Sequence, residues 1–221
     1  VELDIFDPEI IAPLEKERIR KLFDFSERDF IFAFCGRIGK EKNIGTVLDF
    51  ASKTFKPDDN IKILIIGDGP NLEEHKKQAE NHNLSQKVKF SGKVDHKTLP
   101  VYYKACDAYL TASLSEMFSI SMLEAMAMGL PVLQLNDEMN SGQITHGVNG
   151  YIYKNAKEMY GFMADLRDTP KVEYENLKKR VRSSVEKMGA ESLAKSILEI
   201  YESVLSKDSL NKKKKRKKFI I

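Results

Sequence analysis

The sequence is poor in cysteine and contains no long apolar run, and both shortages exclude classes of protein. Cys35 and Cys106 lie far apart, each within an apolar stretch, so we expect buried, reduced thiols instead of a disulfide framework. No apolar run approaches the roughly 18 residues that a transmembrane helix needs. The residues after Val1 do not resemble a secretion signal, and we expect the chain to begin inside a longer protein.

Histidine is also scarce, and the 4 histidines lack the spacing of a zinc site, so we expect no bound metal. Positive charge is concentrated at one end. The net charge of +3 includes 7 consecutive basic residues, 212–218, and subtracting these seven charges leaves −4 for the remainder. An acidic body without a basic face argues against nucleic acid as the main partner.

Apolar runs alternate with amphipathic stretches along the chain. Continuous apolar runs, such as Phe30 to Cys35, are typical of strands buried on both faces of a parallel sheet. Because strands that alternate with helices form βαβ units, we predict an α/β fold, a Rossmann-like doubly wound parallel sheet with helices on both faces. The expected strands are 30–35, 61–66, 88–90, 108–111, 132–135 and 150–153, and the expected helices are 13–25, 70–83, 96–105, 156–167, 173–188, 191–206 and segments around 47–55 and 120–130.

Glycine-rich or charged turns follow the predicted strands. In a parallel sheet of this class, ligands bind at the carboxyl ends of the strands. The residues that this places on one rim are Gly36, Arg37, Lys42, Gly67, Val94 and Glu116. The dinucleotide pattern G-x-G-x-x-G is absent, which disfavours a hydride-transfer enzyme.

The stretch 112–132 carries two glutamates, Glu116 and Glu124, in a loop and a short helix between two strands. Free N–H groups at the start of such a helix bind phosphate and hydroxyl oxygens, so two carboxylates that bracket it can hold a nucleotide sugar. The alternative is helix capping, because Ser113 with Glu116 and Ser121 with Glu124 both fit the capping-box spacing. The residues alone leave both interpretations open.

Five motifs occur along the chain in a recognisable order. They are Gly36-Arg37 with Glu41-Lys42-Asn43, Ile65 to Pro70, Val88 to Gly92, Ser115 to Val132 with its Glu-x7-Glu spacing, and Gly147 to Tyr151. Together they resemble the C-terminal half of a retaining glycosyltransferase of the two-Rossmann-domain (GT-B) type, similar to family four. The resemblance covers about residues 28–205 and implies a fold that is one half of a GT-B enzyme.

The resemblance implies a role for each rim residue. Arg37 and Lys42 correspond to cations that neutralise the departing diphosphate without a bound metal, and Glu116 corresponds to the glutamate beside the transferred sugar. These three form the expected catalytic set. Glu124 corresponds to the carboxylate that accepts both ribose hydroxyls. The other expected contacts are Gly36, Gly67 (with a purely structural turn as its alternative), Val94 near the base, and the backbone N–H groups of Phe118, Ser119 and Ile120.

One motif departs from the family pattern. The family has Glu-Gly-Phe-Gly where this chain has Glu116-Met117-Phe118-Ser119. Losing both glycines restricts positive φ angles and adds side chains beside the sugar. We therefore expect this change to bear on the identity of the donor sugar.

The expected organisation is a lead-in over 1–27, a nucleotide-sugar-binding domain over 28–206 and a basic, disordered tail over 207–221. The implied reaction transfers a hexose from a nucleotide sugar, with UDP-glucose as the default, to an acceptor bound by a missing N-terminal domain. A lipid or surface polymer is a candidate acceptor, and no cofactor is expected beside the donor. The alternatives are a non-catalytic nucleotide-sugar-binding module, or an epimerase or phosphorylase of the same architecture.

The basic run 212–218 suggests a location as well as a partner. Basic residues near an anionic leaflet contribute about 1 kcal/mol each, enough together to hold a protein reversibly at a membrane. We expect a cytoplasmic protein, peripheral at the inner face of the membrane, with a solvated tail as the alternative.

Overall fold

The computed structural model describes residues 4–114, 118–138, 142–186, 194–195 and 197–204. It contains one six-stranded sheet in the order β3-β2-β1-β4-β5-β6, and every pair of neighbouring strands is parallel. The strands are β1 (Phe30–Cys35), β2 (Ile61–Ile66), β3 (Val88–Gly92), β4 (Ala108–Thr111), β5 (Val132–Leu135) and β6 (Gly150–Tyr153). The order reverses between β1 and β4, as a doubly wound sheet requires.

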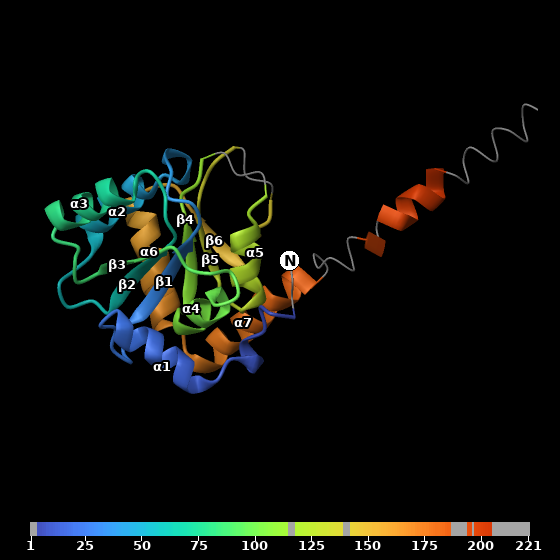
Figure 1. Ribbon diagram of the computed structural model, residues 1–221, viewed down its shortest axis with the longest axis horizontal. Helices are drawn as coiled ribbons and strands as arrows, with labels where there is room; N and C mark the ends of the chain where they lie inside the picture. The colour runs from blue at the N-terminus through green and yellow to red at the C-terminus, as the bar shows by residue number, and fades with distance from the viewer. Residues whose placement is uncertain (1–3, 115–117, 139–141, 187–193, 196, 205–221) are drawn as a thin grey trace, which may run out of the picture.

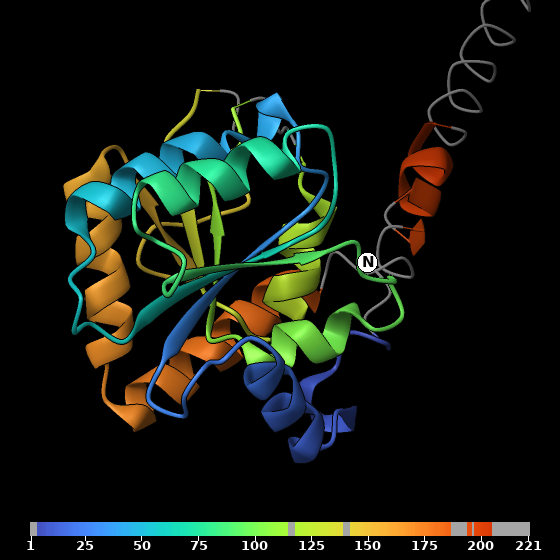
Figure 2. The same ribbon diagram turned by 60° about the vertical axis from the view of Figure 1, so that its left-hand side comes forward.

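Helices cover both faces of the sheet (Figure 1). On one face α2 packs against α3 and α6, and on the other α1 packs against α4 and α5 against α7. The bounds are α1 (Pro13–Leu22), α2 (Ile44–Thr54), α3 (Leu72–Asn81), α4 (Leu99–Ala105), α5 (Ile120–Ala127), α6 (Ala156–Asp168) and α7 (Lys171–Glu186), with 3-10 turns η1 (Pro8–Ile10) and η2 (Lys40–Lys42). The predicted Rossmann-like α/β fold is confirmed (Figure 2).

The central strands have buried side chains along their whole length, which explains their unbroken apolar sequences. All four residues of β4 and of β5 are buried, and in β1 and β2 only the ends or one lysine reach solvent. A strand covered by helices on both sides has no solvent face, so its sequence shows no alternation. Burial of this kind contributes about 25 cal/mol per Å² of apolar surface and is the main stabilising term.

Several helix ends differ from the sequence prediction. α4 begins at Leu99 instead of at His96, and α3 begins at Leu72, after Pro70 instead of at it. In α4 the first turn contains Pro100, a residue that suits the start of a helix because it lacks an N–H group. Residues 93–98 therefore form a loop before the helix, and His96 lies in this loop.

The described part of the predicted lead-in is bound to the domain. Phe6 is completely buried in the main core, and Asp7 forms an ion pair of 3.1 Å with Arg182 in α7. Arg20, in α1, donates to the carbonyl oxygens of three residues and to the carboxylate of Asp107 at 2.7 Å. These contacts fix residues 4–22 against the sheet and α4. The predicted basic tail, 207–221, lies outside the described residues.

Candidate nucleotide-binding site

The loops that follow β1, β2 and β3 are hydrogen-bonded to one another at the carboxyl edge of the sheet. The N–H group of Gly36 donates to the carbonyl of Ile66 at 3.0 Å, and that of Gly67 donates to the carbonyl of Gly92 at 3.0 Å. The next loop joins them, because the N–H group of Leu114 donates to the carbonyl of Glu41 at 3.2 Å. The strand ends therefore form one connected rim, as the sequence predicted.

Gly67 has a structural reason to be glycine. Its φ is +140°, and a Cβ atom there would overlap the carbonyl oxygen of Gly36 and lie 3.0 Å from the carbonyl carbon. The two backbones cross too closely for any side chain. This contact favours the tight-turn role for Gly67. Val94, further along the rim, is half-buried and packs against the core.

Glu124 lies in α5 and is 6% exposed. The N-cap of α5 is Ser119, whose side chain accepts from the N–H group of Met122 at 3.4 Å, so the capping-box interpretation of Ser121 with Glu124 is wrong. The hydroxyl of Ser121 instead lies 3.0 Å from the hydroxyl of Tyr109. The other proposed box includes Glu116, which lies outside the described residues together with the rest of 115–117.

The Glu124 carboxylate is held by a histidine that the sequence prediction missed. Nε2 of His96 lies 2.7 Å from Oε1 of Glu124, and the His96 side chain is 53% exposed. The ring of Phe6 backs the His96 ring edge to face, with the ring centroids 5.3 Å apart. His96 follows Val94 by two positions in the same loop, and this proximity to a predicted base contact was the only available signal in the sequence.

Lys42 and Glu124 both lie near the end of β1. The Lys42 Cε lies 3.6 Å from where a Gly36 Cβ would stand. The pKa of the Cys35 thiol is raised to about 11, chiefly by burial; a hydrogen bond with Tyr103 lowers it, the Glu124 charge raises it and the Lys42 charge lowers it. Both charges therefore act on one half-buried thiol at the end of β1. The Arg37 side chain is exposed beside them.

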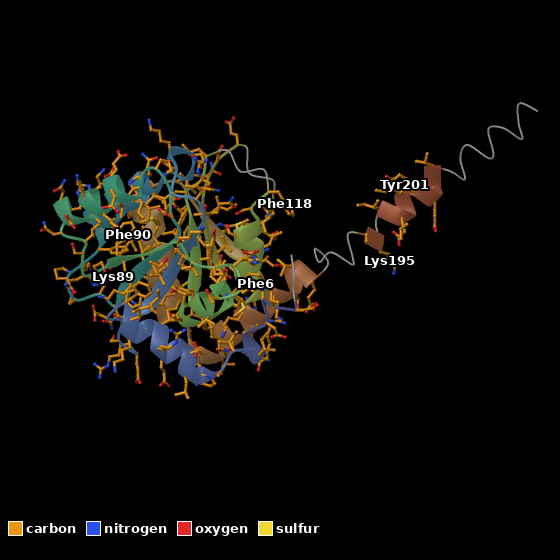
Figure 3. The ribbon with its side chains drawn as sticks, in the orientation of Figure 1. Phe6, Lys89, Phe90, Phe118, Lys195 and Tyr201 are labelled. Carbon is orange, nitrogen blue, oxygen red and sulfur yellow. The ribbon has the colours of Figure 1, made fainter. Side chains whose placement is uncertain are left out.

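The start of α5 differs from the predicted arrangement of three free N–H groups. The Ser119 N–H donates to Oε1 of Gln143 at 2.9 Å, so a ligand that used this group would have to displace that bond. The φ of Ser119 is −93°, an ordinary value, so its position requires no glycine. Phe118 and Ile120 are exposed, and Figure 3 shows Phe118 on the outside of the body.

Within the described residues, no group of three or more His, Cys, Asp or Glu side chains is arranged to hold a metal ion. None of the described helices is long and apolar enough to cross a membrane. Arg37 and Lys42 are two cations of the loop that follows β1.

A cavity of about 610 Å³ opens at the opposite end of the sheet, beside the start of β1. It contains Arg20 and Asp107, but these charges are satisfied within the fold. The Asp107 carboxylate accepts from Arg20 at 2.7 Å and from the Ile31 N–H at 2.8 Å, and the Asp107 carbonyl accepts from the hydroxyl of Tyr174. The ion pair between Arg20 and Asp107 anchors α1, and the hydrogen bond from Tyr174 anchors α7. These structural contacts explain why charged residues gather beside this cavity without a ligand.

Comparison with known proteins finds relatives in sequence and in fold. The chain is 27% identical over 213 residues to alpha-monoglucosyldiacylglycerol synthase of Streptococcus pneumoniae, covering 96% of this chain and 47% of that protein. HepE of Anabaena, solved with UDP, superposes with a TM-score of 0.78 at 19% identity, covering 92% of this chain and 56% of that one. The C-terminal domain of a Francisella tularensis group 1 glycosyl transferase (LpcC) superposes with a TM-score of 0.69 at 22% identity, covering 84% of this chain and 96% of that one.

The chain spans about half the length of the curated relatives it matches. At these identities the structural likeness shows the fold, which is that of GT-B glycosyltransferases. The family itself follows from the sequence, because a family model matches residues 15–183. That range contains Gly36, Lys42, His96 and Glu124. The chain belongs to the glycosyl transferases group 1 family, as a C-terminal domain of that family.

Proposed function

We propose that this chain is the donor-binding half of a retaining glycosyltransferase that transfers a hexose from a nucleotide sugar. UDP-glucose is the proposed donor. The observation that carries the proposal is the buried Glu124 carboxylate beside Lys42 and Gly36, at the carboxyl edge where sheets of this class bind ligands. A relative named for a glucosyl lipid and a fold neighbour solved with UDP support the choice of donor.

Each proposed role follows from the chemistry of the side chain. A carboxylate has lone pairs enough to accept two hydroxyl groups, so Glu124 suits the ribose. Lys42 and Arg37 are cations that stabilise the charge developing on a departing nucleoside diphosphate, and metal independence belongs to the proposal for this reason. Gly36 leaves room for that diphosphate close to the backbone. Glu116, which lies outside the described residues, is proposed to act beside the transferred sugar.

The acceptor is proposed to bind a second, N-terminal half of the same protein. A helical segment beyond α7, residues 197–204, supports this partner because its apolar side chains are exposed. These side chains are 42–64% exposed and are Ile197, Leu198, Ile200, Tyr201 and Val204. Their spacing is that of one apolar helix face, which needs a covering surface. The second half is the proposed occupant, since the curated relatives are about twice as long.

A lipid acceptor and a cytoplasmic location at the inner membrane face complete the proposal. The name of the Streptococcus pneumoniae relative includes a diacylglycerol product, which supports a lipid. The basic run 212–218 is the proposed membrane contact, and it lies outside the described residues. We further propose that the fragment alone binds the nucleotide without transferring sugar, because the acceptor side of the site is missing.

A titration of the chain with UDP-, GDP- and ADP-sugars tests the proposal. We expect UDP-glucose and UDP to bind, and Glu124→Ala to weaken both about 10- to 100-fold, the value of a hydrogen bond to a charged group. Glu116→Ala should leave UDP affinity nearly intact and reduce the extra affinity of UDP-glucose. Unchanged UDP affinity in a folded Glu124→Ala protein would overturn the assignment.

A further inference from the structure

The contact between His96 and Glu124 involves one of the two oxygens of the carboxylate that is proposed to bind the ribose. An ionised carboxylate only accepts hydrogen bonds, so Nε2 of His96 donates to Oε1 of Glu124 over 2.7 Å. This bond engages Oε1 and leaves the second carboxylate oxygen, Oε2, for another donor. The Glu124 side chain is 8% exposed.

We propose that His96 is a positioning residue of the donor site, which fixes the Glu124 carboxylate so that Oε2 faces the ribose hydroxyls. This inference rests on the proposed function of Glu124. A glutamate side chain has three rotatable bonds, and an unheld carboxylate would lose that freedom on each binding event. A carboxylate already held at one oxygen binds its ligand at a lower entropic cost.

The surroundings of His96 suit this role because its ring is itself held in place. Phe6 is completely buried and contacts the His96 ring edge to face, and Phe6 in turn lies 6.2 Å from the ring of Tyr103 in α4. The opposite side of His96 is half-exposed, which leaves the rim accessible. A rigid backing of this kind is what a positioning group requires.

The loop 93–98 gains a second role from this contact. It carries Val94, proposed to lie against the base, and His96, which acts through Glu124 on the ribose. Under this proposal, one loop contributes both to binding of the base and to binding of the ribose.

The test compares ligands with and without ribose hydroxyls, so that positioning is separated from folding. His96→Ala should weaken UDP binding about 2- to 10-fold, the range for ordering one side chain on binding, when measured by calorimetry or NMR titration. It should leave the affinity for 2′,3′-dideoxy-UDP unchanged, because that ligand makes no use of the Glu124 orientation. His96→Gln keeps an N–H donor at nearly the same reach and should restore most of the affinity for UDP.

His82→Ala is the matched control. His82 lies at the end of α3, and its Nε2 is 3.0 Å from Oδ1 of Asp49, a similar pair remote from the rim. This variant should bind both ligands like the unmodified chain, while melting curves report any loss of stability in either histidine variant.

The outcomes separate the inference from the proposed function. If Glu124→Ala reduces UDP affinity but His96→Ala does not, the proposed function stands and the positioning role of His96 is refuted. Equal weakening of UDP and dideoxy-UDP by His96→Ala also refutes it, because the effect is then not on ribose. If Glu124→Ala itself leaves UDP binding unchanged, the proposed function fails and the inference fails with it.

Discussion

Gly67→Ala tests whether the rim glycine serves the fold rather than the ligand. The new Cβ would overlap the carbonyl oxygen of Gly36, and its backbone would need to keep a φ of +140°, which only glycine adopts readily. Relief requires the ends of β1 and β2 to move apart, and these ends carry the hydrogen bond from Gly36 to Ile66. We therefore expect lower stability together with a displaced rim.

The magnitude combines two costs. An alanine in a backbone conformation reserved for glycine costs about 1–3 kcal/mol, and the overlap with packed backbone adds about 1–3 kcal/mol. The total loss in unfolding free energy is about 2–6 kcal/mol. For a domain of this size each kcal/mol lowers the melting temperature by about 2–4 °C, so Gly67→Ala should lower it by about 4–24 °C.

Gly92→Ala is the control, because it separates backbone conformation from overlap. Gly92 has a φ of +70°, but a Cβ there would meet nothing within 4 Å. Only the conformational cost of about 1–2 kcal/mol remains. Urea unfolding and calorimetric titration with UDP should be measured on both variants. If Gly67→Ala is as stable as Gly92→Ala and binds UDP no worse, the crossing of the two backbones does not constrain this position and our reasoning is refuted.

Four further predictions concern stability, reactivity, metal and membrane. Asp107→Ala should lower the unfolding free energy by about 2–4 kcal/mol in urea, because it leaves the buried Arg20 charge without its carboxylate; an unchanged midpoint would contradict this. Cys35 should react slowly with iodoacetamide at neutral pH and faster as the pH approaches its raised pKa of about 11, as mass spectrometry can follow, whereas rapid labelling of folded protein at neutral pH would contradict its burial. UDP affinity in EDTA should stay within a few-fold of that in magnesium, and a hundredfold loss, about 2.7 kcal/mol, would reveal a metal site. The full chain should sediment with anionic vesicles at low salt but not at high salt, and equal sedimentation of a chain ending at residue 209 would exclude the basic run 212–218 as the contact.

The central strands were predictable because they are buried on both faces. All six predicted segments became strands, with β3 extending to Gly92, although the edge strands β3 and β6 are only partly buried. Helix ends were harder, as α4 shows. The sequence prediction began this helix at residue 96, whereas α4 begins at Leu99 with Pro100 in its first turn. His96, in the turn before the helix, contacts Glu124, 28 residues away. The proline is a local signal for the start of the helix, whereas the contact with Glu124 has no signal in the local sequence.

The site was predictable where it depends on strand ends and motif order. Gly36, Gly67, Lys42 and Glu124 lie on the expected rim because parallel strands bring their carboxyl ends to one edge. The sequence did not predict hydrogen-bond partners that come from distant loops. Gln143 accepts a hydrogen bond from the Ser119 N–H at the start of α5. The position of a glutamine within a polar loop does not indicate which N–H group it will bind.

The departure from the family motif at Ser119 has a different consequence from the one its sequence suggested. Its φ of −93° needs no glycine, and its 5% exposed side chain caps α5, which is favourable because serine is a preferred N-cap. The added side chain therefore does not crowd the rim at this position. Its N–H group is instead held by Gln143, so a donor sugar that used this group would have to displace an existing hydrogen bond. Gly36, Lys42 and Glu124, proposed to bind the nucleotide, match the family pattern, whereas the altered loop is proposed to face the sugar. Selection of the nucleotide and selection of the sugar would thus depend on separate parts of the rim, and changes in one can leave the other intact.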